Sequence, residues 1–301
     1  LLLGHRRLAI IDLSPEGHQP MASASQRYMI SYNGEIYNFL ELRAELEQAG
    51  VKFRGRSDTE VILAAIEQWG LNLTLQKING MFALALWDRK LRQLHLVRDR
   101  LGKKPLYAGW AGKTLVFGSE LKALQMHPDF KAAIQPEALQ LYLTHGYVCA
   151  PRTIYHNVWA VLPGHRMILT LETLESGSNL AAAMEPYWHH WRVIEEARLK
   201  TPPRTDAEAV EDFENLLSRC VKERMISDVP LGAFLSGGID SSAVVALMQR
   251  NAARPVKTYT VGFQEDGFDE AAHAKAVAAH LGTDHHEMVV TGQNALDVIP
   301  L

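Results

Sequence analysis

The sequence predicts two domains of different fold class, an α+β domain built on an antiparallel sheet and then an α/β domain built on a parallel sheet. Short apolar segments separated by turn residues dominate the first half, a pattern typical of antiparallel hairpins. From residue 205 onward, strand and helix patterns alternate, which is the order of a parallel sheet with crossover helices. Residues 171–204 follow neither pattern and contain Pro202-Pro203, so they indicate a connection.

In the first domain, apolar segments pair as two hairpins across short polar turns. The paired segments are Met81–Asp88 with Gln93–Asp99, and Leu106–Trp110 with Thr114–Ser119. Two other stretches carry apolar residues at helical spacing, and each ends at a glycine. These predicted helices are Phe39–Gly50 and Thr59–Gly70.

In the second domain, Thr205 and Glu208 have the spacing of a capping box and predict the start of a helix. The predicted strands that follow are Val229–Leu235, Val256–Phe263 and His286–Val290. The helices predicted between them are Ser241–Arg250 and Asp269–Leu281, the second with Asp269 as its N-cap.

Composition excludes several classes of function. A net charge of −3 without a run of like charges argues against nucleic-acid binding. No apolar run reaches the ~20 residues that cross a membrane. Two cysteines give no disulfide framework and suit a reducing compartment, so we expect a cytoplasmic protein. A homodimer is compatible with this composition but is not indicated by it.

The segment with the clearest chemistry is Ser236-Gly237-Gly238-Ile239-Asp240-Ser241-Ser242, between a predicted strand and a predicted helix. Glycine backbone, serine hydroxyls and a helix N-terminus together form a cradle for an anion such as a phosphate. Asp240 would repel phosphate unless Mg²⁺ lies between them. A bare Gly-Gly would indicate only a tight turn, but the whole string at this junction predicts a nucleotide site.

A second group of polar residues could bind an amino acid. Arg7 could clamp a carboxylate, and Asp58 could hold an ammonium group. Asn33 and Gly34 offer the amide donors of an oxyanion hole. Each residue alone has a simpler explanation: Asn33-Gly34 is a common hairpin turn, Asp58 or Ser57 could cap a helix, and Arg7 could be a surface charge.

The stretch from Ser227 into the glycine loop resembles the PP-loop ATP pyrophosphatases, which cleave ATP to AMP and pyrophosphate. The resemblance implies that Leu235, Ser236, Gly237, Gly238, Asp240, Ser241 and Ser242 hold the pyrophosphate of ATP. It also implies that Asp240 lies near Mg²⁺ and that Val261 contacts the adenine.

The first domain resembles the class II glutamine amidotransferases, with the motif order of the glutamine-dependent asparagine synthetases. The motifs are Asn33–Asn38, Ser57–Glu60, Asn79–Ala83, Arg98–Tyr107 and Gly118–Leu124. The resemblance implies the αββα sandwich of the N-terminal nucleophile hydrolases. It also implies that Arg7 binds the α-carboxylate of glutamine, that Glu35 and Asp58 bind its α-amino group, and that Asn33 and Gly34 form the oxyanion hole.

The resemblance implies a glutaminase domain over residues 1–175, a linker over 176–204 and a synthetase domain over 205–301. The expected reaction is ATP-dependent conversion of aspartate and glutamine into asparagine and glutamate. The nucleophile of this family is an amino-terminal cysteine, whereas Cys149 and Cys220 are internal, so we expect this stretch alone to be inactive.

Two alternatives stay open. A related amidotransferase could use another carboxylate acceptor, in a polysaccharide or antibiotic pathway. The chain could also bind nucleotide or glutamine without catalysis. A zinc site at His285-His286-Glu287 is disfavoured, because no further histidine follows at the required spacing.

Overall fold

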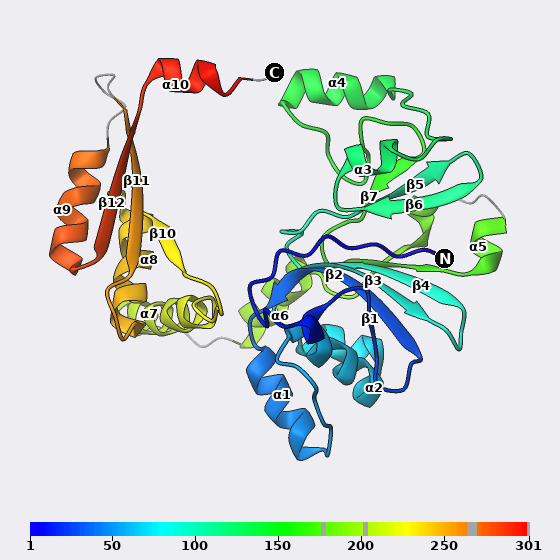
Figure 1. Ribbon diagram of the computed structural model, residues 1–301, viewed down its shortest axis with the longest axis horizontal. Coiled ribbons are helices and arrows are strands. Elements are labelled where there is room, and N and C mark those ends of the chain that lie inside the picture. Colours follow the sequence, from blue (N-terminus) through cyan, green and yellow to red (C-terminus); the bar gives the residue numbers. More distant parts are fainter. Residues whose placement is uncertain (176–178, 201–203, 264–269, 300–301) are drawn as a thin grey trace. The chain divides into compact units, whose positions relative to one another are not determined.

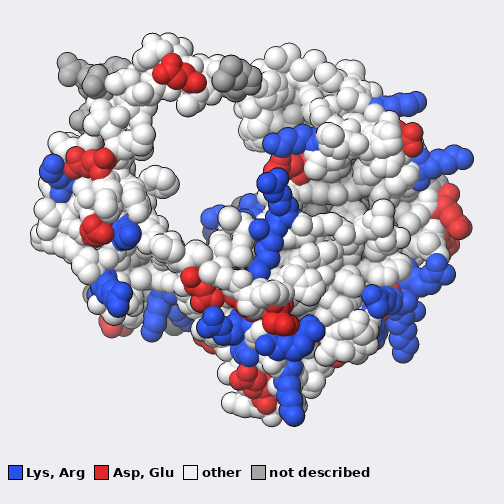
Figure 2. Space-filling model, in the orientation of Figure 1, with Lys and Arg blue, Asp and Glu red and all other residues white. Residues whose placement is uncertain are grey.

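The computed structural model describes residues 1–175, 179–200, 204–263 and 270–299. Two compact units divide the chain, Leu1–Thr201 and Pro202–Leu301, and each is described by itself. No helix within these described ranges is long and apolar enough to cross a membrane. Basic and acidic side chains are interspersed on the face shown in Figure 2, as the small net charge leads one to expect.

The first unit contains two antiparallel sheets. The larger has the strand order β1-β2-β3-β4-β8-β9, and the smaller has the order β6-β5-β7. The strands of the larger sheet are β1 (Met21–Ala22), β2 (Tyr28–Ile36), β3 (Gly80–Asp88), β4 (Gln93–Arg98), β8 (His165–Leu169) and β9 (Met184–Pro186). Those of the smaller are β5 (Tyr107–Ala111), β6 (Thr114–Gly118) and β7 (Val158–Ala160). Both predicted hairpins are confirmed, as β3 with β4 and β5 with β6.

The first unit is layered as helix, sheet, sheet, helix (Figure 1). Helices α1 (Phe39–Gln48) and α2 (Asp58–Lys77) lie on one side of the larger sheet. Helices α3 (Leu121–Gln125) and α4 (Pro136–His145) lie beyond the smaller one. Buried side chains from both sheets form a single core, so the sheets pack face to face. This layering is the αββα sandwich that the resemblance implies.

Small residues occupy part of this core, next to β2. Ala83 and Ala85 on β3 and Ala108 on β5 are buried between the sheets, together with the larger Leu96 and Met167. Alanine leaves room that leucine would fill, so the two sheets can enclose a cavity without separating.

Helix α2 consists of two helical segments. The first segment ends at Gly70, as the sequence predicts, where the backbone leaves the helical conformation; the second segment, which continues to Lys77, is not predicted. Gly70 has a φ of 78°, a left-handed value that glycine adopts easily and that bends the helix. Thr74 and Leu75 are buried beyond the kink, and this packing holds the second segment in place. The prediction for α1 is also close, since it ends two residues before Gly50.

Part of the expected connection is ordered against the first unit. Strand β9 pairs with β8, and Leu180 in the short helix η2 (Leu180–Ala183) is fully buried. The Tyr187 hydroxyl donates to the carbonyl of Arg98 at 2.8 Å. Two further helices of this unit are α5 (Leu171–Glu175) and α6 (His190–Lys200), and η1 (Pro15–Gly17) is a short 3-10 turn. The domain boundaries themselves stay a prediction.

The second unit contains a parallel sheet in the order β10-β11-β12, as the alternating pattern predicts. Its strands are β10 (Gly232–Phe234), β11 (Lys257–Phe263) and β12 (Asp284–Val290). Its helices are α7 (Asp206–Glu223), α8 (Ile239–Asn251), α9 (Ala271–Leu281) and α10 (Gly292–Asp297). The capping box of Thr205 and Glu208 is confirmed. The predicted N-cap Asp269 lies outside the described residues.

Candidate active sites in the two units

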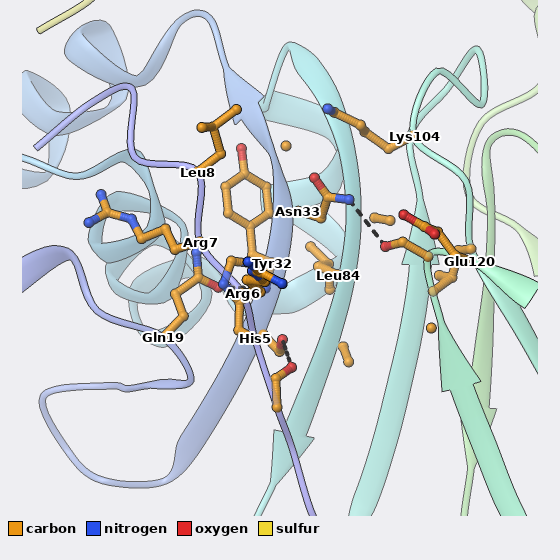
Figure 3. Close-up of a pocket in the computed structure, with 18 of the residues that line it drawn as sticks. His5, Arg6, Arg7, Leu8, Gln19, Tyr32, Asn33, Leu84, Lys104 and Glu120 are labelled. Atoms are coloured by element: carbon orange, nitrogen blue, oxygen red, sulfur yellow. Dashed lines mark hydrogen bonds between the residues drawn. The ribbon is translucent and has the colours of Figure 1, made fainter. Parts of the chain in front are cut away.

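A cavity of about 890 Å³ opens in the first unit along the edge of β2. Strand β1 covers only the beginning of this edge, because it pairs with Ile30 and Met29 alone. The N-terminal segment runs beside the remainder, where the Ser31 hydroxyl donates to the carbonyl of Gly4 at 3.2 Å. Five predicted site residues line this cavity, from the N-terminal segment, β2 and the start of α2 (Figure 3). They are Arg7, Asn33, Gly34, Glu35 and Asp58.

The backbone of Gly34 turns toward the cavity side of β2. Gly34 pairs with Phe82 on β3. The N–H of Phe82 donates to the Asp99 carboxylate, and its carbonyl accepts from the Asp99 N–H. Gly34 and Phe82 therefore form a non-hydrogen-bonded pair, and the Gly34 N–H points away from β3. On the open edge, the N–H of Tyr32 donates to Gln19 Oε1 at 2.6 Å, and that of Ile36 donates to Asp58 Oδ2 at 3.0 Å. The Gly34 N–H between them has no partner among the described residues.

A glycine is required at position 34 by the approach of two strands. A Cβ at this position would lie 2.2 Å from the carbonyl oxygen of Met81 and 2.7 Å from the Cα of Phe82. Asn33 and Gly34 lie inside β2, so the simpler explanation of a hairpin turn does not apply. The Asn33 Nδ2 donates to the hydroxyl of Ser119 at 3.1 Å (Figure 3). The strand thus presents one side-chain and one backbone amide side by side.

Asp58 is a buried acid, and it is not the cap of its helix. The N-cap is Ser57, whose hydroxyl accepts from the N–H of Glu60 at 3.3 Å. The Asp58 carboxylate accepts instead from the Tyr32 hydroxyl at 2.8 Å and from the N–H of Ile36. Burial raises the pKa of Asp58, although these hydrogen bonds oppose the rise. Burial, followed by the charge of Asp58, raises the pKa of Tyr32 well above its usual value, so Tyr32 stays a donor.

The raised pKa of Asp58 predicts a pH-dependent stability. The folded state holds the Asp58 proton more tightly than the unfolded state, whose pKa is near 3.8. The stability that protonation adds is present below that value and is lost as the pH rises through the folded-state pKa. As the pH rises above about 4, the wild type should therefore lose unfolding free energy relative to Asp58→Asn. Urea unfolding of both proteins measures this difference, and a constant or opposite trend would contradict the assignment.

The Arg7 guanidinium is bound to the loop that follows it. Its Nη2 donates to the carbonyls of Ile11 and Asp12, each at 2.7 Å, and the group lies against Gly17. In Figure 3 the side chain points away from Asn33, so the structure does not place its charge beside the two amides. Glu35 lies two residues beyond Asn33 on β2, on the same face of the strand. The roles of Arg7 and Glu35 in binding stay predictions.

Several residues around this cavity have roles that the sequence did not predict. Gln19 bridges the N–H of Tyr32 and the hydroxyl of Thr59. The buried carboxylate of Asp99 accepts four backbone N–H groups at 2.9–3.1 Å, from Phe82, Leu101, Lys103 and Lys104. This carboxylate fixes the loop that carries Lys104 into the cavity wall. Asp99 and Ser119 lie in the motifs Arg98–Tyr107 and Gly118–Leu124, but their roles depend on partners that are distant in the sequence.

In the second unit, the glycine loop joins β10 to α8 as predicted. Leu235 is buried, donates its N–H to the carbonyl of Tyr259 at 2.9 Å, and accepts from the Thr260 hydroxyl at 2.5 Å. Gly237 has a φ of 78°, and a Cβ there would lie 2.7 Å from the backbone nitrogen of Ala274. Glycine is therefore required at this position by conformation and by space.

The loop also presents hydrogen-bonding groups suited to an anion. Gly238 is the N-cap of α8, so the first-turn N–H groups at residues 239–241 have no partner within the helix. The hydroxyls of Ser236 and Ser241 lie 2.9 Å apart, and the Ser242 hydroxyl is buried without a partner in the described part of the chain. These groups fit the phosphates of a nucleotide.

Two predicted ligand contacts remain accessible. Asp240 is exposed in the first turn of α8, and Val261 is 41% exposed near the carboxyl end of β11. Ligands of open α/β sheets bind at that end. Within the described ranges, no three acidic, histidine or cysteine side chains are placed so that they could hold a metal ion by themselves. Mg²⁺ commonly binds one carboxylate together with substrate phosphates, and Asp240 fits that arrangement.

Comparison with known proteins decides the family. The glutamine amidotransferase domain family matches residues 1–188, more than half of the chain. The chain belongs to this amidotransferase family. The asparagine synthase family matches residues 212–301, which include the whole glycine loop. The two family matches thus follow one another in the order that the sequence predicts.

Related proteins support the same assignment. Asparagine synthetase [glutamine-hydrolyzing] 3 of Bacillus subtilis is 33% identical over 99% of this chain and 48% of its own length. A putative asparagine synthetase of Mycobacterium tuberculosis is 37% identical over 100% of this chain and 45% of its own. Amidase chyE of Penicillium rubens is 34% identical over 94% of this chain and 42% of its own. The amidotransferase chain thus spans less than half the length of these curated relatives.

Proposed function

We propose that the protein containing this chain is a glutamine-hydrolysing asparagine synthetase. Glutamine and water would give glutamate and ammonia in the first unit. In the second, ATP and aspartate would give pyrophosphate and a β-aspartyl-adenylate, from which ammonia displaces AMP to form asparagine. The observation that carries the proposal is the presence, on one chain, of the paired amides of Asn33 and Gly34 and of the glycine loop. We place this protein in the cytoplasm, where cysteines such as Cys149 and Cys220 stay reduced.

In the glutaminase half, the side-chain amide of Asn33 and the N–H of Gly34 would donate to the γ-carbonyl oxygen as it gains negative charge. Asp58 and Glu35 would hold the α-ammonium group, and the positive charge of that group would favour the ionised form of Asp58. Arg7 would meet the α-carboxylate from the N-terminal segment. The nucleophile in this proposal is a terminal cysteine of the longer protein, because neither Cys149 nor Cys220 lines the cavity.

In the synthetase half, ATP would supply the adenylyl group that makes the carboxylate reactive, and pyrophosphate would leave as that bond forms. The loop from Leu235 to Ser242 would hold that pyrophosphate through backbone N–H groups and serine hydroxyls. The unpartnered Ser242 hydroxyl is the best supported of these contacts. Asp240 would hold Mg²⁺, and Val261 would contact the adenine.

Pyrophosphate release across a panel of carboxylates tests the acceptor. The full-length protein would be supplied with ATP, glutamine and one acid at a time. We expect aspartate to give the fastest release, with glutamate, citrulline and buffer alone near background. Release with another acid and none with aspartate would contradict asparagine synthesis.

A second candidate function is amide formation on a different acceptor. The similarity to Amidase chyE, 34% identical over 94% of this chain, supports it. Both functions share the glutamine cavity and the glycine loop, so the acid panel separates them.

Replacing Gly237 by alanine should weaken ATP binding at least about 10-fold, because the side chain would strain the left-handed loop and meet α9. Isothermal titration of the chain with ATP measures the affinity. The matched control is Gly282→Ala, since Gly282 has a φ of 70° but open space around it. Gly282→Ala should retain ATP affinity at a similar cost in backbone strain. Equal affinities for the wild type and both variants would contradict the loop assignment.

A further inference from the structure

Asn33 and Ser119 join the two sheets at the cavity. Asn33 lies on β2 of the larger sheet, whereas Ser119 directly follows β6 of the smaller sheet. Their side chains meet through the bond from Asn33 Nδ2 to Ser119 Oγ at 3.1 Å, across 86 residues of sequence (Figure 3). Both residues line the same cavity.

The smaller sheet holds Ser119 in a fixed place. The preceding Gly118 pairs with Tyr107 on β5, and a Cβ on Gly118 would lie 3.1 Å from the Leu124 side chain. The following Glu120 is the N-cap of α3 and accepts from the N–H of Ala123 at 3.1 Å. Ser119 therefore sits on a short connection anchored at both ends.

A primary amide has two N–H donors in one plane. The terminal torsion of asparagine is broad, so without a partner the amide plane samples many orientations. One donor given to Ser119 restricts that plane and leaves the second donor of Asn33 for a ligand. A preorganised donor stabilises developing charge without reorganisation during the reaction.

We infer that Ser119 is a positioning residue that orients the Asn33 amide for the oxyanion hole. The inference rests on the proposed function, because it needs Asn33 to donate to the γ-carbonyl of glutamine. Ser119 itself touches Asn33 and stays outside the reacting atoms. The larger sheet thus supplies the donor, and the smaller sheet sets its direction.

The test compares Ser119→Ala with Ser119→Thr in the full-length protein, by glutamate release from glutamine. The loss of one hydrogen bond should lower kcat of Ser119→Ala about 10-fold and leave KM for glutamine within about twofold. Ser119→Thr keeps a hydroxyl and should recover most of kcat. The matched control Ser25→Ala also loses a serine hydrogen bond, to Glu67, but lies outside the cavity and should keep wild-type kinetics.

A second readout does not depend on turnover. The side-chain amide signals of Asn33, assigned in the ¹⁵N spectrum through their absence in Asn33→Ala, should shift in Ser119→Ala and stay near their wild-type position in Ser119→Thr. A wild-type kcat and unshifted signals in Ser119→Ala would overturn the inference while leaving the oxyanion hole intact. A wild-type kcat in Asn33→Ala would instead overturn the oxyanion hole, and the role of Ser119 with it.

Discussion

Replacing Asn33 by alanine should lower kcat for glutamine hydrolysis about 10²- to 10³-fold, the usual effect of removing one oxyanion-hole donor. The donor acts mainly on charge that develops in the transition state, so KM for glutamine should change little. Glutamate formation by the full-length protein without ATP measures this effect. Asn33→Asp should be as impaired, because a carboxylate of similar shape offers no donor and repels the developing charge.

The matched control is Asn72→Ala. Asn72 also uses its side-chain amide group in a hydrogen bond, to Arg166, but it lies outside the cavity. Its removal should leave both kinetic constants near those of the wild type. An Asn33→Ala variant with wild-type kcat, or one changed only in KM, would contradict the oxyanion role.

Replacing Asp99 by alanine should lower the unfolding free energy of the first unit by about 3–5 kcal/mol. The Asp99 side chain accepts four backbone N–H groups and is only 1% exposed, so alanine would leave several buried donors unpaired. All six tryptophans lie in the first unit, so tryptophan fluorescence during urea unfolding reports on that unit alone.

The comparison variant for Asp99 is Asp129→Ala, at an exposed position in the same unit. Surface substitutions of this kind usually change stability by less than about 0.5 kcal/mol. A loss below about 1 kcal/mol in Asp99→Ala would mean that the loop after β4 does not depend on this carboxylate.

Helices, strands and loops that have a local sequence pattern could be predicted from the sequence. The glycine loop is contiguous, and the strand before it and the helix after it each have a periodic signal, so its place at the β10–α8 junction followed from the order of residues. The hairpins of the first unit and the capping box at Thr205 were predictable for the same reason.

Features that depend on distant partners could not be predicted in this way. Asn33-Gly34 has the composition of a turn, and only pairing with β3 shows that it lies within a strand. Gly70 ends one helical segment, as predicted, but the second segment after it is held by burial of Thr74 and Leu75, which the local sequence does not show. Leu180 and β9 are too short to give a periodic pattern, and their order comes from packing on the first unit.

Dependence on distant partners also limits which features of the site could be predicted from the sequence. Arg7, Asn33 and Asp58 were candidates from their chemistry and Glu35 from a resemblance, and all four line one cavity. The bonds that organise the cavity cross long intervals, 26 residues from Tyr32 to Asp58 and 86 residues from Asn33 to Ser119. The orientation of Arg7 toward its own loop likewise depends on how residues 11–17 fold.

One protein should couple glutamine hydrolysis to ATP-dependent amide synthesis, and transfer of an isotope label tests this coupling. The full-length protein would be incubated with ATP, aspartate and glutamine labelled with ¹⁵N at the side-chain amide. We predict that the label appears in the side-chain amide of asparagine, in an amount equal to the AMP formed, and that Asn33→Ala lowers the rate of this transfer about 10²- to 10³-fold while free ammonia restores synthesis. Label that appears only as ammonia, with no labelled amide product, would contradict the account.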